Sequence, residues 1–367
     1  MTPLPPWRDR FGRKALGRMA LGLAVGAVGG AIAWWLHVPL AWMLGALFLC
    51  MAAALAGLRV DVPLWLRANF MVLVGLFLGE SFDGLTLEAL ARWPITLLGA
   101  ILYVPVAGGA AYLYYRFLIR QDVLTAACSA IPGGLTAVVI LSSELGGDER
   151  SVALSQSLRI AIVIFSAPAI AFGLLAFAPP AEDLLSSRPV ISWGDFAVLG
   201  VAALAATWVL QRVGLPLAFL IGPILASALL RIGGVVEGAL PHWLVEVALV
   251  VTGSAIGSRF QGTKLRLWLR VAAATLGGTA ILMAVTAVFA SAMSALAGLD
   301  YTVALLAYAP GGVTEMSLIA LAIDADPGFV AVHHVARIAF ILIVVPIFAV
   351  WLRRRLGLAE GPEADRP

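Results

Sequence analysis

The sequence predicts an all-α polytopic membrane protein with a two-fold internal repeat in inverted arrangement, about ten crossings and two broken or re-entrant segments. Hydrophobic residues make up 62% of the 367 residues and charged residues 12%, which is too apolar for a soluble protein of this length. The motif Pro132-Gly133-Gly134-x-Thr136 returns 178 residues later as Pro310-Gly311-Gly312-x-Thr314. The apolar runs are long and uninterrupted, which predicts helices rather than the short alternating strands of a barrel.

Each copy of the repeat contains six apolar segments. In the first copy they cover residues 15–36, 40–58, 67–82, 93–118, 123–145 and 150–177. In the second copy they cover residues 193–212, 216–232, 243–259, 267–298, 302–323 and 328–352. We therefore divide the chain into a basic cytoplasmic N-terminus, a first membrane repeat, a polar linker, a second membrane repeat and a disordered tail. These parts are residues 1–14, 15–177, 178–192, 193–355 and 356–367.

The charges between the segments indicate that the two copies have opposite orientations. The loop over residues 80–92 is acidic, whereas its counterpart over residues 259–270 is basic. Basic residues concentrate on the cytoplasmic side of membrane proteins. Inversion requires one segment of six to enter and leave on the same side, and the Pro-Gly-Gly segments, 123–145 and 302–323, are the natural candidates. Both termini are then cytoplasmic.

The two Pro-Gly-Gly elements predict broken helices at membrane depth. Proline cannot donate to a helical ladder, and paired glycines favour an unwound backbone. The helix that restarts after each break points its N-terminal amides, and Thr136 or Thr314, at the gap, where they can bind an anion. A kink retained only for packing is the alternative. The predicted substrate-binding residues at the breaks are Pro132, Gly133, Gly134, Thr136, Pro310, Gly311, Gly312 and Thr314.

Arg159 and Arg337 are equivalent residues deep inside apolar segments. An arginine at the bilayer centre costs about 2.5–3.5 kcal/mol on insertion scales, so each side chain must face the bundle interior and find an acceptor. One interpretation is structural, with each guanidinium capping carbonyls at the opposite broken helix. The other is functional, with the pair flanking a carboxylate, phosphonate or sulfonate. Both can hold together.

Three ionisable residues break the symmetry between the copies. Glu315 stands where the first copy has Ala137, so it is a candidate for coupling to a proton or Na⁺. A charge partner for one of the arginines is the alternative role. His333 and His334 replace Ser155 and Gln156, and histidine suits proton relay. Adjacent residues cannot both face one side of a helix, so we expect only one ring at the site. We expect no metal and no other cofactor.

The pattern resembles the AbrB-type membrane protein family of bacteria. Each Pro-Gly-Gly-x-Thr element is followed, 25 residues after its second glycine, by an intramembrane arginine. The openings Pro39-x2-Trp42-x2-Gly45 and Pro216-x2-Phe219-x2-Gly222 fit the family too. Members carry the labels ammonia monooxygenase-like, transcriptional regulator and transporter. The fold is similar to that of cation–proton antiporters and anion transporters, in which the broken segment often crosses fully, so re-entrant and crossing arrangements both stay open.

These observations favour a secondary transporter of a small anionic organic solute in the bacterial cytoplasmic (inner) membrane. No nucleotide-binding Gly-x4-Gly-Lys element is present, so an ion gradient would supply the energy. The alternatives are an indirect role in gene expression and a monooxygenase-like enzyme, although the chain has few ligands for a redox metal. We expect no enzymatic activity, contacts with lipid but not with nucleic acid, and consider a homodimer because Gly22-x3-Gly26-x3-Gly30 permits close helix contact.

Overall fold

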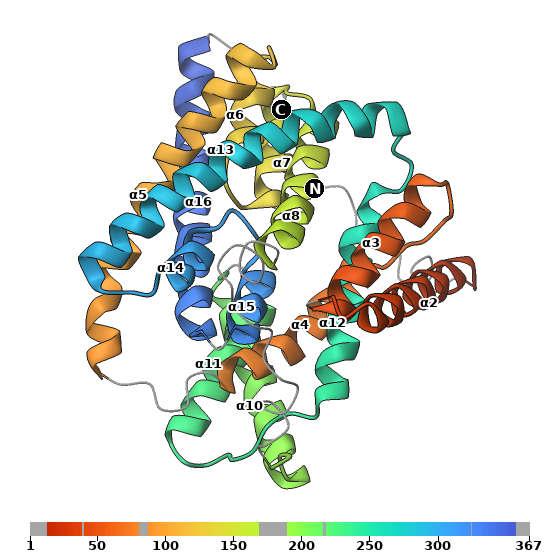
Figure 1. Ribbon diagram of the computed structural model, residues 1–367, viewed down its shortest axis with the longest axis vertical. Coiled ribbons are helices and arrows are strands. Elements are labelled where there is room, and N and C mark those ends of the chain that lie inside the picture. The colour runs from red at the N-terminus through yellow and green to blue at the C-terminus, as the bar shows by residue number, and fades with distance from the viewer. Residues whose placement is uncertain are drawn as a thin grey trace, which may run out of the picture. The chain divides into compact units, whose positions relative to one another are not determined.

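The computed structural model is all-helical in the part of the chain that it describes, residues 13–38, 40–80, 87–168, 189–215, 218–323 and 325–356. Two compact units can be distinguished (Figure 1). Unit 1 comprises Met1–Leu85, Ala176–Leu265 and Leu321–Gly328, and unit 2 comprises Thr86–Leu175, Arg266–Ala320 and Phe329–Pro367. Each unit therefore combines segments from both copies of the sequence repeat.

Unit 1 holds the first three helices of each copy. Those of the first copy are α2 (Arg13–Trp35), α3 (Ala41–Leu55) and α4 (Leu64–Gly79). Those of the second are α10 (Trp193–Arg212), α11 (Ala218–Ile232) and α12 (His242–Gly257), followed by the short 3₁₀ helix η4 (Ser258–Phe260).

Equivalent glycines join the two halves of unit 1 in a reciprocal way. Gly75 of α4 lies against the carbonyl of Leu220 in α11, so closely that an added Cβ would overlap it. Gly253 of α12, the equivalent residue, lies in the same way against the carbonyl of Met43 in α3. A small residue is needed wherever two backbones approach this closely. The two halves of unit 1, one from each half of the sequence, thus pack closely against each other at these glycines.

The glycine stripe of α2 is also used inside unit 1. Gly22 faces Val62, Gly26 faces Ser254, and Gly30 faces Trp42. The stripe could serve contacts within one protomer or between two protomers, and the structure shows contacts within the protomer. The homodimer stays a prediction and gains no support from these glycines.

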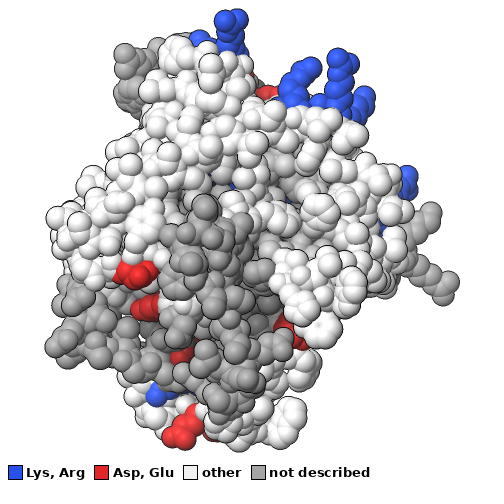
Figure 2. All heavy atoms as spheres, in the orientation of Figure 1, with Lys and Arg blue, Asp and Glu red and all other residues white. Residues whose placement is uncertain are grey.

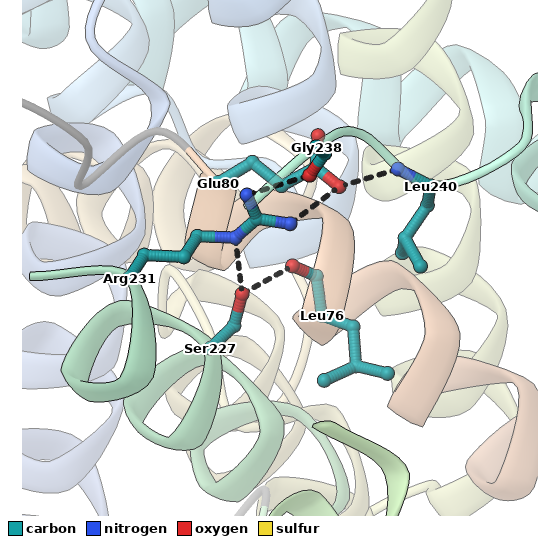
Figure 3. A network of polar contacts seen from close by, with 6 residues as sticks. All are labelled: Leu76, Glu80, Ser227, Arg231, Gly238 and Leu240. Carbon is teal, nitrogen blue, oxygen red and sulfur yellow. Dashed lines mark hydrogen bonds and ion pairs between the residues drawn. The ribbon is translucent and has the colours of Figure 1, made fainter. Parts of the chain in front are cut away.

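A buried ion pair ties α11 to the end of α4 (Figure 3). The Nη2 of Arg231 lies 3.2 Å from Oε1 of Glu80. The same carboxylate oxygen accepts the backbone N–H of Leu240 at 2.8 Å, and Arg231 also donates to the carbonyl of Gly238 at 2.8 Å. Ser227 completes the network by donating to the carbonyl of Leu76 at 2.9 Å. These bonds satisfy charges that would be costly to bury alone.

Unit 2 holds the remaining helices of both copies. From the first copy come α5 (Leu87–Leu113) with the π-helical turn η2 (Tyr114–Leu118), α6 (Val123–Ala130), α7 (Leu135–Leu145) and α8 (Glu149–Pro168). From the second come α13 (Leu265–Ala297), α14 (Tyr301–Tyr308), α15 (Val313–Ala322) and α16 (Pro327–Leu356).

The equivalent helices α5 and α13 run antiparallel in unit 2 (Figure 1). Gly99, near the start of α5, faces Met293 near the end of α13. Midway, Thr286 donates to the hydroxyl of Tyr103 at 3.0 Å. Tyr115, just after α5, lies against Gly278 in the first half of α13. Residue numbers therefore rise along one helix as they fall along the other.

Each predicted break separates two short helices, and α6 and α7 form a hairpin. Asp122 caps the start of α6 by accepting the N–H groups of Leu124 at 3.0 Å and Thr125 at 2.9 Å. Just beyond the end of α7, the N–H of Asp148 donates to Oγ1 of Thr125 at 2.8 Å. The chain thus returns to the end of the hairpin at which it entered.

The second broken element follows the same course. Asp300, equivalent to Asp122, caps α14 through the N–H groups of Thr302 at 2.7 Å and Val303 at 3.3 Å. In α16, His334 contacts the carbonyl of Leu306, and Arg337 contacts that of Ala309. The helices α14 and α16 therefore run parallel, which requires α15 between them to run back.

The helices suit a membrane in length and composition. Seven helices in the described residues are long and apolar enough to cross a bilayer, and Ala41–Leu55, Trp65–Gly79 and Ala218–Ile232 are shorter apolar helices. Figure 2 shows Lys and Arg side chains gathered at one edge of the drawn face, over the part of unit 2 where α5 ends and α13 begins. Arg116 and Arg120 belong to the first of these segments, and Arg266 and Arg270 to the second.

Candidate functional site

The first hairpin tip depends on two glycines in left-handed backbone conformations. Gly133 has φ 152° and Gly134 has φ 66°, a region that residues with a Cβ rarely adopt. Both are covered by Ile341 of α16, since an added Cβ would come within 3.0 Å of that side chain at Gly133 and 3.2 Å at Gly134. Pro132 is buried beside them. The break is therefore a packed turn inside unit 2.

Two side chains of α8 satisfy the carbonyls that this break leaves without helical partners. Arg159 donates from Nη1 to the carbonyl of Ile131 at 2.6 Å. Gln156 donates from Nε2 to the carbonyl of Cys128 at 2.9 Å and to that of Ile131 at 3.1 Å. A freed carbonyl in an apolar environment is costly without such a donor.

The second tip is capped by α16 in the same manner. Arg337 donates from Nη1 to the carbonyls of Ala309 at 2.7 Å and Tyr308 at 3.1 Å, and from Nη2 toward that of Gly311 at 3.4 Å. His334 contacts the carbonyl of Leu306 at 2.9 Å through Nε2. Pro310 is buried at the turn, as is Gly311.

The principal contacts of the two tips recur at the offset of 178 residues. Arg159 on Ile131 corresponds to Arg337 on Ala309, and Gln156 on Cys128 corresponds to His334 on Leu306. Each arginine caps carbonyls of the break in its own copy. The expectation that each would cap the opposite break is wrong, because α8 and α16 run beside the short helix that precedes their own break.

The two tips lie next to each other along α16. Arg337 reaches the second break, and Ile341, one helical turn later, covers the first. The guanidinium groups of Arg159 and Arg337 are close enough to repel each other electrostatically. Among the residues that the structure describes, neither guanidinium has a carboxylate partner, and Nε of each is buried without a hydrogen bond. Unit 2 thus brings two buried cations together, and the Nε–H group of each remains available as a donor.

The hydroxyl and ring of Tyr103 lie beside this pair. Its side chain is fully buried in α5, and its ring centroid is 6.0 Å from Cζ of Arg337. An aromatic ring at this distance attracts a cation weakly. Tyr103 also interacts electrostatically with Arg159, so both arginines act on it.

Glu315 lies at the second break and is 1% exposed. It occupies the first turn of α15, and its carboxylate folds back over Gly312, where a Cβ would overlap it. A larger residue at Gly312 would therefore displace the Glu315 carboxylate from this position. A carboxylate near a helix N-terminus is stabilised by the helix dipole.

His333 and His334 are both fully buried but have different partners. His334 contacts Arg337 through Nδ1 at 3.1 Å. His333 contacts the carbonyl of Phe329 through Nδ1 at 2.8 Å and Oγ1 of Thr96 through Nε2 at 2.8 Å. As expected, the two rings point to different sides of α16.

Of the two threonines of the motif, Thr314 has a described side chain and Thr136 does not. Thr314 is buried in the first turn of α15. Thr136 lies in the first turn of α7, but its side chain lies outside the described residues. Among the described residues, no group of three His, Cys, Asp or Glu side chains is placed to hold a metal ion.

Sequence reasoning missed several residues around the tips. Gln156 was treated only as the counterpart of His334, and Thr96, Tyr103 and Tyr308 were not considered. Asp122 and Asp300 were missed too, although an aspartate before an apolar run at the repeat offset is a recognisable cap signal. The sequence does not indicate the roles of the other residues, because the partner of a polar residue in an apolar helix is apparent only from the three-dimensional structure.

The chain is similar to known proteins over most of its length. Residues 42–353 match the family model described as "Transition state regulatory protein AbrB". The chain belongs to the AbrB family. A protein of Bacillus subtilis (strain 168), named "Uncharacterized protein YhjN", is 26% identical over 94% of each chain. The "Putative regulator AbrB" of Escherichia coli (strain K12) is 29% identical over 85% of this chain and 90% of its own. The match to the family includes both hairpin tips and both arginines.

Proposed function

We propose that this AbrB-family protein is a secondary active transporter of a small anionic organic solute, driven by a proton or Na⁺ gradient. The observation that supports it most directly is the pair Arg159 and Arg337, two buried cations at adjacent hairpin tips without a carboxylate partner in the described residues. Buried charges are normally paired. An anionic ligand would supply the missing charge.

The transporter architecture that we propose is an inverted repeat with about ten crossings and cytoplasmic termini. The two hairpins enter from opposite sides as re-entrant segments, and their tips meet inside unit 2. The antiparallel course of α5 and α13 supports inversion. The recurrence of the capping contacts at one offset supports the repeat.

At this site the backbone and the arginines act together on the anion. The helices α7 and α15 restart at the tips, so their N-terminal amides carry partial positive charge there. Nε of Arg159 and Nε of Arg337 offer additional donors. The capping bonds hold both guanidinium groups in place, so the binding site is formed before the ligand arrives.

The coupling role of Glu315 follows from its place at the same tip. In the simplest scheme the carboxylate releases its ion as the site opens inward, which links the gradient to solute movement. Glu315→Gln should then transport without the Na⁺ or pH response of the wild type. A variant that keeps the full response would leave Glu315 with a structural role only.

The site is tested by ligand-induced stabilisation of the purified protein. A panel of carboxylates, phosphonates and sulfonates is screened for shifts in Tm at two pH values, and stabilising anions are followed by flux into liposomes. Arg159→Gln should lose the shift, whereas Arg270→Gln, at an exposed position on α13, should keep it. If no anion stabilises the wild type, or if the Arg159 variant responds equally, the anion site is refuted.

The names of the family and of the E. coli relative favour a second candidate, an indirect role in gene expression. We propose that such an effect would act through the transported solute. A strain lacking the protein should then regain normal transcript levels with the wild-type protein but not with Arg159→Gln. Equal rescue by both would separate regulation from transport.

A further inference from the structure

We propose that His333 reversibly binds the coupling proton, and that its neighbour His334 stays neutral as part of the second hairpin tip. The inference rests on the proposed transport function and names a proton site that acts together with Glu315. It follows from the directions in which the hydrogen bonds around the two rings must run.

The contacts of His334 allow only its neutral form. Nε2 faces the carbonyl of Leu306, which can only accept, so this nitrogen carries the proton. Nδ1 lies 3.1 Å from Nη2 of Arg337, which can only donate, so Nδ1 must accept. A second proton, on Nδ1, would place an N–H donor of His334 directly opposite an N–H donor of Arg337, which is a permanent cation. Gln156, the equivalent residue, makes the matching contact to Cys128 without being titratable.

The contacts of His333 allow both of its protonation states. Nδ1 faces the carbonyl of Phe329 at 2.8 Å and therefore donates in either state. Nε2 lies 2.8 Å from Oγ1 of Thr96, and a hydroxyl can donate or accept. Oγ1 of Thr96 is also 3.0 Å from the carbonyl of Trp93.

Binding of a proton is therefore accompanied by rotation of the Thr96 hydroxyl. With His333 neutral, Thr96 donates to Nε2. With His333 charged, Nε2 donates to Thr96, and Thr96 turns its proton to Trp93. Burial disfavours the charged ring, and acceptors at both nitrogens reduce this cost because hydrogen bonds from a cation are the stronger kind.

The surroundings of His333 link this site to the hairpin tip. From α5 it faces Thr96, and from α14 it faces Tyr308, whose ring centroid is 6.3 Å away. Tyr308 donates to the carbonyl of Thr96, and its own carbonyl accepts from Arg337. On α16 itself, the Phe329 ring lies at 3.9 Å and His334 is adjacent. Loss of the α5 contact would remove an acceptor from the charged ring and release the proton.

Nitrogen NMR of histidine-labelled protein in lipid nanodiscs tests the assignment without any ligand. The chain has four histidines, and single His→Gln variants assign their signals. Between about pH 8 and pH 4, His333 should pass from one protonated nitrogen to two, while His334 keeps a proton on Nε2 alone. A His333 that stays neutral wherever the protein remains folded, or a His334 that titrates, would overturn the proposal.

Variants of Thr96 and flux measurements add matched controls. Thr96→Val should lower the proton affinity of His333 about tenfold, because the charged form loses the stronger bond, whereas Thr96→Ser should preserve it. In liposomes, His333→Gln should abolish the pH dependence of flux and His334→Gln should retain it. The reverse pattern would refute the coupling role. Absence of flux in every protein would refute transport, while the NMR titration would still decide the proton site.

Discussion

At the scale of single residues, the buried arginines cap the broken helices, and we propose that they also bind the anionic solute. Each guanidinium caps carbonyls that a broken helix cannot satisfy, and each retains a buried Nε without a partner. Arg337 makes the larger set of contacts, to three carbonyls and to His334. The planar fork of arginine suits several acceptors at once, which the single ammonium of lysine does not.

Arg337→Lys should therefore destabilise the protein although the charge is kept. We expect a loss of about 1–3 kcal/mol in the free energy of unfolding, because carbonyls buried at the tip lose their donors. Chemical denaturation in detergent measures this loss. Arg270→Lys, at an exposed position on α13, is the control and should leave stability unchanged. Equal stabilities of the two variants would contradict the capping role.

At the scale of elements, the first hairpin is held at its open end as well as at its tip. Asp122 caps α6, and the N–H of Asp148 closes the hairpin onto Thr125. The carboxylate of Asp148 accepts from the backbone N–H of Ser151 at 3.1 Å and from its hydroxyl at 2.5 Å. Partial burial would raise the pKa of Asp148, but the hydrogen bonds from Ser151 and the charge of Arg150 outweigh it, and the pKa is lowered.

Asp148→Asn should loosen the start of α8 in a pH-dependent manner. Because the folded pKa of Asp148 is lowered, its carboxylate stabilises the fold above the ordinary value of about 3.9, and the gain disappears as pH falls through the folded value. Hydrogen exchange of peptides covering residues 122–152 should be faster in the variant at neutral pH. The difference should vanish in acid, and a constant difference would exclude the carboxylate as its cause.

At the scale of the whole molecule, each of the two compact units combines segments from both halves of the sequence. Unit 1 takes the first helices of both copies and unit 2 takes the broken helices of both. In unit 1, the reciprocal contacts of Gly75 and Gly253 show why neither half would bury its surface alone. In unit 2, Lys and Arg side chains gather at one edge of the drawn face, over the part where α5 ends and α13 begins (Figure 2).

The inverted topology that we propose predicts which loops are reached from outside the cell. Lys264→Cys, in the basic loop before α13, should resist a membrane-impermeant thiol reagent, because basic loops remain cytoplasmic. Val235→Cys, in the exposed loop after α11, should react. The parent protein is the control, since Cys50 and Cys128 are both buried. Rapid labelling at position 264 in intact cells would contradict the inversion.

The sequence by itself determined the helical class, the segments and the two breaks, because these depend on local chemistry. Long apolar runs favour helices in lipid, and Pro132-Gly133-Gly134 interrupts a helix wherever it occurs. Only the tertiary structure decided which atoms meet. It placed each arginine at the break of its own copy, His333 within hydrogen-bond distance of Thr96, and His334 within hydrogen-bond distance of Arg337. The physical reason is that hydrogen-bond partners far apart in the chain are chosen by helix packing, and two adjacent histidines differ only in what each ring faces.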